Sequence, residues 1–96
     1  MPSPRFKVYT STNKYVAACE YAEDAAAVVA NYTAGSIRDG HSRKVWTEGK
    51  DGDAGASYDA VAALVWERIE AKARVDYDKV YGAGAYDRFV ARTTEV

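Results

Sequence analysis

Residues 44–59 read KVWTEGKDGDAGASYD, and this stretch predicts a strand, a glycine-containing loop and the start of a helix. KVWT has the β-branched and aromatic content of a strand. Gly49, Gly52 and Gly55 punctuate the loop at every third position. Ser57 is a plausible N-cap residue, and Asp59 supplies negative charge in the first helical turn. We therefore expect a helix to begin close to residue 57.

The predicted helix is long. Apolar residues recur at three- and four-residue spacing as far as Tyr81, where Gly82 and Gly84 interrupt the pattern. These apolar positions are Val61, Ala62, Val65, Trp66, Ile69, Ala73, Tyr77 and Val80. Glu70, Arg74 and Asp78 predict a charge ladder along the exposed side. AYDRFVART at residues 85–93 predicts a short final helix.

The segment before the glycine loop predicts a hairpin and a helix. FKVYT at residues 6–10 and YVAACE at residues 15–20 have strand composition, and AEDAAAVVANYT at residues 22–33 predicts a helix that stops at Gly35. Ile37 and Arg38 predict at most a minor ribbon beside the strand at residues 43–48. A right-handed crossover then places that strand beside the first one, in sheet order 2-1-3.

The predicted fold class is α+β: a small three- to four-stranded, mainly antiparallel sheet in ββαβα order. A short and a long helix cover one face, and a short C-terminal helix follows. We expect residues 1–96 to form a single domain, because a chain of this length encloses one core.

Composition narrows the class of protein. Apolar residues make up 48% and charged residues 28% of the chain, and the formal net charge is −1, without the basic excess typical of nucleic-acid binders. Residues 1–50 carry seven basic and five acidic side chains, so any cationic surface is local. The single cysteine and the absence of an apolar leader at the N-terminus predict a cytoplasmic protein, and no apolar run is long enough to cross a membrane.

Strand alternation divides the predicted sheet into two faces. Val8 and Val45 are expected in the core with Phe6, Val16 and Ala18. The uncovered face is expected to carry three aromatic residues and two lysines, with Glu48 beside them: Lys7, Tyr9, Tyr15, Lys44 and Trp46. These side chains would shield one another, form a protein-protein hot spot, or bind single-stranded nucleic acid by stacking and phosphate contact.

The glycine loop does not match a ligand-binding motif. A phosphate-binding loop requires G-x-x-x-x-G-K-[ST], whereas this loop adds Asp51 and Asp53, which repel an anion. A calcium loop would require a glycine at its sixth position and a glutamate at its twelfth, and both are missing. The Gly49–Gly55 segment is expected to be a connector, and neither a cofactor nor a metal ion is predicted.

Cys19 and His41 are the only pair that could form a thiol nucleophile and its base. Cys19 lies within a predicted strand and His41 follows a tight turn, so a thiol enzyme is an unfavoured alternative. One histidine and one cysteine are also too few for a zinc site.

The distal part of the long helix carries Tyr77 and Tyr81. A helix of about 25 residues spans about 37 Å, whereas a six-residue strand spans about 20 Å. Its apolar stripe must therefore be covered by the final helix or by a second copy of the chain in a homodimer.

These patterns favour a non-enzymatic protein-interaction module acting through an aromatic surface, either the open sheet face or the end of the long helix. Small chains of this kind are often accessory or inhibitory factors, such as phage or mobile-element proteins that bind a larger protein machine. The alternative is single-stranded nucleic-acid binding on the open sheet face.

Overall fold

The computed structural model describes residues 5–94. The strands are β1 (Phe6–Tyr9), β2 (Tyr15–Cys19), β3 (Ser36–Arg38) and β4 (Lys44–Thr47), and the helices are α1 (Ala22–Val29), α2 (Tyr58–Tyr81) and α3 (Ala85–Thr94). The chain divides into two compact units, with the boundary between Trp66 and Glu67 inside α2. The predicted α+β class and the long and short helices are confirmed.

The sheet has four strands in the order β2-β1-β3-β4, and all neighbouring strands are antiparallel. The predicted order 2-1-3 was wrong in one respect, because the short segment at Ile37 and Arg38, not KVWT, lies beside β1. A five-residue connection joins β3 to β4 as a hairpin, so KVWT must become the edge strand. β3 therefore runs antiparallel to β1, as was expected for KVWT, whereas KVWT in β4 runs in the same direction as β1.

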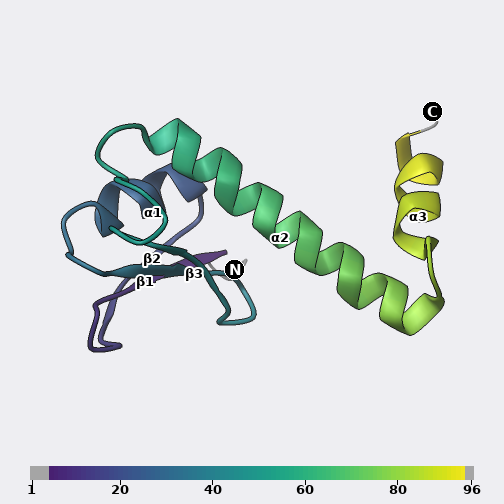
Figure 1. The fold of residues 1–96 in the computed structure, drawn as a ribbon, viewed down its shortest axis with the longest axis horizontal. Helices are drawn as coiled ribbons and strands as arrows, with labels where there is room; N and C mark the ends of the chain where they lie inside the picture. The colour runs from purple at the N-terminus through teal and green to yellow at the C-terminus, as the bar shows by residue number, and fades with distance from the viewer. Residues whose placement is uncertain (1–4, 95–96) are drawn as a thin grey trace. The chain divides into compact units, whose positions relative to one another are not determined.

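The core lies between one face of the sheet and two helices, α1 and the first turns of α2 (Figure 1). Phe6, Val8, Val29, Ile37 and Val65 are its largest fully buried side chains. The small residues of α1, Ala22, Ala25 and Ala26, are also buried and allow this helix to approach the sheet closely.

α1 ends at Val29, four residues earlier than predicted. The side-chain amide of Asn31 donates to the Ala27 carbonyl, the acceptor that the Asn31 backbone N–H would use in a longer helix. The Asn31 N–H instead donates to Val28. Side-chain competition of this kind is the reason that asparagine terminates helices.

The predicted core positions of Val16 and Ala18 were wrong. Ala17 pairs with Val8 and Cys19 with Phe6, whereas Ala18 is exposed opposite Lys7. The register shifts next to Tyr9, which leaves Val16 as the extra residue of a bulge. A one-residue shift moves every later side chain of a strand to the other face.

α2 begins as expected, because the Ala60 backbone N–H donates to the Ser57 hydroxyl at 3.2 Å. Val61, Ala62 and Val65 are buried. The Trp66 ring makes an edge-to-face contact with Phe6, with 5.4 Å between ring centroids, and still remains 42% exposed. Packing of these first turns completes the core of the unit that ends at Trp66.

The second unit joins the end of α2 to α3. Asp78 Oδ1 accepts the Tyr86 N–H at 2.8 Å, and the Tyr77 ring contacts Tyr86 and Phe89. Arg74 pairs with Asp87 of α3 at 3.2 Å. Arg74 and Asp78 thus bond the start of α3 instead of forming the charge ladder predicted along α2. Within residues 5–94, no helix has the length and apolar character needed to span a membrane.

Candidate functional site

The face of the sheet opposite α1 carries a row of three cations. Lys7 of β1 pairs directly with Arg38 of β3, and Arg38 pairs with Lys44 of β4. Directly paired residues have Cβ atoms about 4.5–5.5 Å apart, so three basic side chains start next to one another across three strands. We call Lys7, Arg38 and Lys44 the cation row.

Two tyrosines lie beside the cation row. Tyr9 pairs with Tyr15 across β1 and β2, and their rings meet edge to face with 5.9 Å between centroids. The Arg38 guanidinium carbon lies 4.2 Å from the Tyr9 ring centroid, and Arg38 Nη2 donates to Asn13 Oδ1 at 3.0 Å. Tyr15 is 59% exposed, whereas Tyr9 is half-buried. The structure therefore brings Lys7, Tyr9, Tyr15 and Lys44 together on one face, as predicted, and adds Arg38.

Two polar atoms on this face lack partners among the described residues. The Ser36 hydroxyl and Arg38 Nε are both buried without a hydrogen bond. Ser36 pairs with Tyr9, so its side chain shares the face of the cation row. A buried polar group without a hydrogen bond costs about 1–3 kcal/mol. These atoms are groups that an acceptor-bearing ligand would satisfy after a rearrangement of Arg38.

The predicted position of Trp46 on the open face was wrong. Trp46 pairs with Ile37, which pairs with Val8, so all three lie on the core side, and Trp46 is only 5% exposed. The register shift between Ile37 and Arg38 changes the alternation in β4. Val45 is buried as expected. Sequence reasoning missed Arg38 because it treated Ile37 and Arg38 as a minor ribbon.

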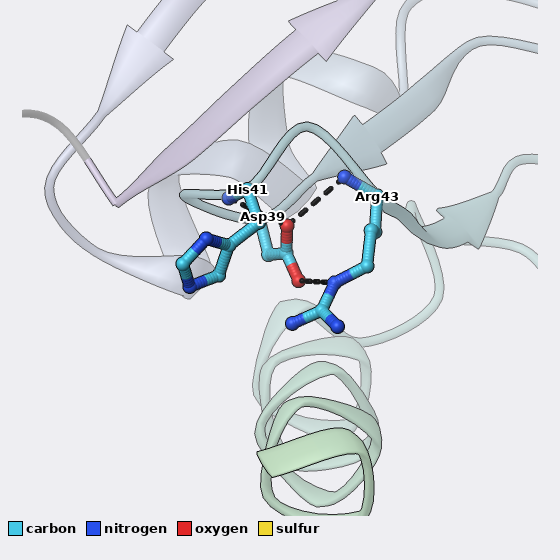
Figure 2. Close-up of polar contacts among 3 residues, drawn as sticks. All are labelled: Asp39, His41 and Arg43. Atoms are coloured by element: carbon cyan, nitrogen blue, oxygen red, sulfur yellow. Dashed lines mark hydrogen bonds and ion pairs between the residues drawn. The ribbon is translucent and has the colours of Figure 1, made fainter. Parts of the chain in front are cut away.

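Asp39 organises the hairpin that connects Arg38 to Lys44. Its carboxylate accepts the backbone N–H groups of His41 and Arg43 and, at 3.2 Å, the Nε of the Arg43 guanidinium (Figure 2). Burial alone would raise the pKa of Asp39, but these hydrogen bonds and the charge of Arg43 outweigh burial and lower it. Arg43 is thereby paired within the hairpin, and Asp39 fixes the β3–β4 connection.

The glycine loop uses its own carboxylates to hold its backbone. Glu48 accepts the N–H groups of Gly49 and Ala54, and Asp53 accepts that of Gly55. These amides are already occupied, so the loop is not arranged as a phosphate cradle. A Cβ atom at Gly52 would lie 3.0 Å from Trp46 Cη2. The glycine at this position allows the loop to pack closely against Trp46.

Cys19 and His41 lie on different elements of the sheet unit. Cys19 lies on the edge strand β2 and His41 lies in the β3–β4 hairpin. In the sheet, β1 lies between β2 and β3. Burial, and to a smaller degree the charge of Asp24, raises the pKa of the Cys19 thiol. A thiol nucleophile needs the opposite shift. Among the described residues, no cluster of three or more metal-ligating side chains is present.

The aromatic residues predicted at the end of the long helix form a separate group. Tyr77 and Tyr81 contact each other with 4.6 Å between ring centroids. Tyr77 is half-buried against α3, but Tyr81 is 66% and Val80 is 73% exposed. The final helix therefore covers only part of the apolar surface in the second unit.

Comparisons with protein-family models, curated proteins and solved structures find no match to this chain.

Proposed function

We propose that the protein is a non-enzymatic interaction module whose open sheet face binds an acidic segment of a larger protein. The observation that carries the proposal is the cation row, in which Lys7, Arg38 and Lys44 are directly paired across three strands. Like charges at directly paired positions destabilise a sheet. An acidic ligand would remove this repulsion.

The charge distribution supports an acidic ligand. In the registered strand pairs, the residues that share the face of the cation row are Tyr9, Tyr15, Ala18, Ser36 and Thr47, and none is acidic. Glu48, which was expected beside them, accepts backbone N–H groups of the glycine loop instead. Arg38 Nε, which is buried without a hydrogen bond, would become a further donor to a carboxylate once Arg38 rearranges.

The aromatic geometry favours a protein over single-stranded nucleic acid. Base stacking needs exposed ring faces. Burial of Trp46 leaves two tyrosines on the open face, and Arg38 already lies over the ring of Tyr9. The net charge of −1 provides little general attraction for a polyanion. Nucleic-acid binding is therefore the competing outcome of the test below.

We also propose an accessory or inhibitory role for the module, such as that of a phage or mobile-element protein, in the cytoplasm. The raised pKa of the lone thiol at Cys19 supports binding over catalysis.

A homodimer through the second unit is a further part of the proposal. Exposed Val80 and Tyr81 support it, because apolar surface at a helix end needs cover. An antiparallel pairing that sets Ile69 against Val80 of a second copy would also bring Glu70 opposite Lys79, so the charges complement each other. Sedimentation equilibrium tests this directly: Val80→Glu should shift a dimer to a monomer, and a wild-type protein that remains monomeric at high concentration would contradict it.

The open-face proposal is tested by titration with three probes: a glutamate- and tyrosine-containing peptide, its glutamine counterpart, and oligothymidylate. Lys7→Glu with Lys44→Glu should weaken binding of the acidic peptide roughly tenfold, equivalent to about 1.4 kcal/mol. Lys14→Glu with Lys50→Glu makes the same change in net charge outside the cation row and should have little effect.

Two results would contradict the proposal. Equal weakening by both double variants would mean that only net charge matters. Salt-sensitive binding of oligothymidylate, lost in Lys7→Glu with Lys44→Glu and accompanied by no binding of the peptide, would establish the nucleic-acid alternative instead.

A further inference from the structure

A small cavity lies beside the glycine loop, on the other side of the sheet from the cation row. Its volume is about 200 Å³, and it is lined by residues of β4, the loop and the first two turns of α2. The lining residues that matter here are Trp46, Asp51, Asp53, Ala60, Val61 and Leu64. All of them belong to the unit that ends at Trp66.

The apolar part of the cavity is fixed by the core. Trp46 and Val61 are 5% and 3% exposed, and Leu64 is half-buried beside them. The close approach of Gly52 to the Trp46 ring holds the loop against this apolar part. The cavity therefore presents a preformed apolar wall that does not depend on a mobile side chain.

The polar part of the cavity is acidic. Asp51 Oδ2 accepts the Thr47 N–H at 2.6 Å, and Asp53 Oδ1 accepts the Gly55 N–H at 2.9 Å. These bonds hold both carboxylates in place next to the apolar wall. Among the described residues, no basic side chain forms an ion pair with Asp53. The arrangement is complementary to a cation that carries an apolar stem.

We infer that this cavity, which we call the loop cavity, binds an arginine or lysine side chain of a partner protein. The methylene stem would pack on Trp46, Val61 and Leu64, and the charged end would meet Asp53. This inference goes beyond the proposed function, because it concerns a basic group and a different face of the sheet.

Size and ligand number argue against whole small molecules and calcium as occupants. Pockets for whole small molecules and cofactors measure about 300–1,000 Å³, so the loop cavity suits a single side chain. Calcium takes about six to eight oxygen ligands, whereas the described chain places no three metal-ligating side chains together. The Asp53 carboxylate beside an apolar wall is suited to an amphipathic organic cation.

Two variants test the inference with matched controls. Ala60→Lys introduces a lysine side chain at the edge of the cavity. Ala63→Lys introduces the same side chain at an exposed position of α2 outside the cavity. Asp53→Asn removes a charge but keeps the Oδ1 acceptor for Gly55, and Asp59→Asn removes a charge in the first turn of α2 that does not line the cavity. All four positions are exposed, so the variants should fold.

The probes are acetylated, amidated tripeptides Gly-Arg-Gly and Gly-Lys-Gly, with Gly-citrulline-Gly as the uncharged analogue of the arginine peptide. The measurement is the shift of the Trp46 indole N–H resonance in ¹⁵N-labelled protein, assigned with Trp46→Phe. Trp46 lines the cavity, so its indole resonance should respond to a ligand bound there.

The arginine or lysine peptide should move this resonance, and the citrulline peptide should not. Asp53→Asn should weaken binding by about two- to fivefold, the range of a partly exposed ion pair, and Ala60→Lys should abolish the shift. Ala63→Lys and Asp59→Asn should match the wild type. The inference is wrong if the citrulline peptide produces the same shift, if no basic peptide moves the Trp46 resonance, or if both Asp53→Asn and Ala60→Lys bind like the wild type.

Discussion

Reversal of the charge at Lys44 should stabilise the protein, because this residue adds to the repulsion within the cation row. Lys44 lies on the edge strand and has one charged cross-strand neighbour, Arg38. Lys44→Glu replaces a repulsive pair with an attractive one. Cross-strand charge pairs are worth about 0.2–1 kcal/mol, and exposure of Lys44 reduces the effect, so a gain of roughly 0.5–1 kcal/mol is expected.

The unfolding of this unit can be followed selectively, because both tryptophans lie before residue 67. Urea titrations monitored by tryptophan fluorescence should show a higher midpoint for Lys44→Glu at low salt and a smaller difference in about 1 M salt, where the screening length is roughly 3 Å. Lys44→Gln should give about half the gain. Lys50→Glu makes the same charge change beside Glu48, Asp51 and Asp53, and should not stabilise. A lower midpoint for Lys44→Glu than for Lys44→Gln, or a gain unaffected by salt, would refute the reasoning.

Three further changes have defined outcomes. Asp39→Asn should cost about 2 kcal/mol of folding stability at neutral pH, because an amide nitrogen would face the donors of Arg43. Since the pKa of Asp39 is lowered, its contribution is present above about pH 4 and is lost at lower pH. The melting temperatures of variant and wild type should therefore converge in acid, and a pH-independent gap would contradict this. Gly52→Ala should cost about 1–3 kcal/mol of folding stability, because φ at this glycine is +147° and the new Cβ would approach the Trp46 ring. The same change should expose Trp46 to acrylamide quenching. Quenching and stability like those of the wild type would oppose this account. Asp78→Ala should reduce helical circular dichroism at 222 nm and speed amide exchange in α3 by removing the acceptor for Tyr86 N–H, whereas unchanged exchange would show that Asp78 does not hold α3.

Periodicity and capping residues were sufficient to predict most of the elements. The limits of α2 followed from its apolar spacing, Ser57 and the glycines after Tyr81, all of which act locally. The end of α1 was not predicted, because it depends on the Asn31 side chain competing for a backbone carbonyl. The sheet order was missed because three residues, Ser36–Arg38, carry too weak a pattern to compete with KVWT.

The candidate surface was predicted only in part. Lys7, Tyr9, Tyr15 and Lys44 share a face as expected, but alternation failed for Trp46, Val16 and Ala18. Each failure lies at a register shift, and a bulge arises from strand pairing that a local pattern does not encode. Arg38 joins the site for the same reason, since its place beside Lys7 depends on β3 lying next to β1.

A charge-swap measurement tests the central claim most directly, namely that the cation row is the recognition surface. Wild-type protein and the Lys7→Glu, Lys44→Glu double variant would each be titrated with the glutamate-containing peptide and with a counterpart in which lysine replaces glutamate. We predict that the wild type binds the glutamate peptide more tightly and that the variant reverses this preference. Retention of the same preference in the variant would contradict the account.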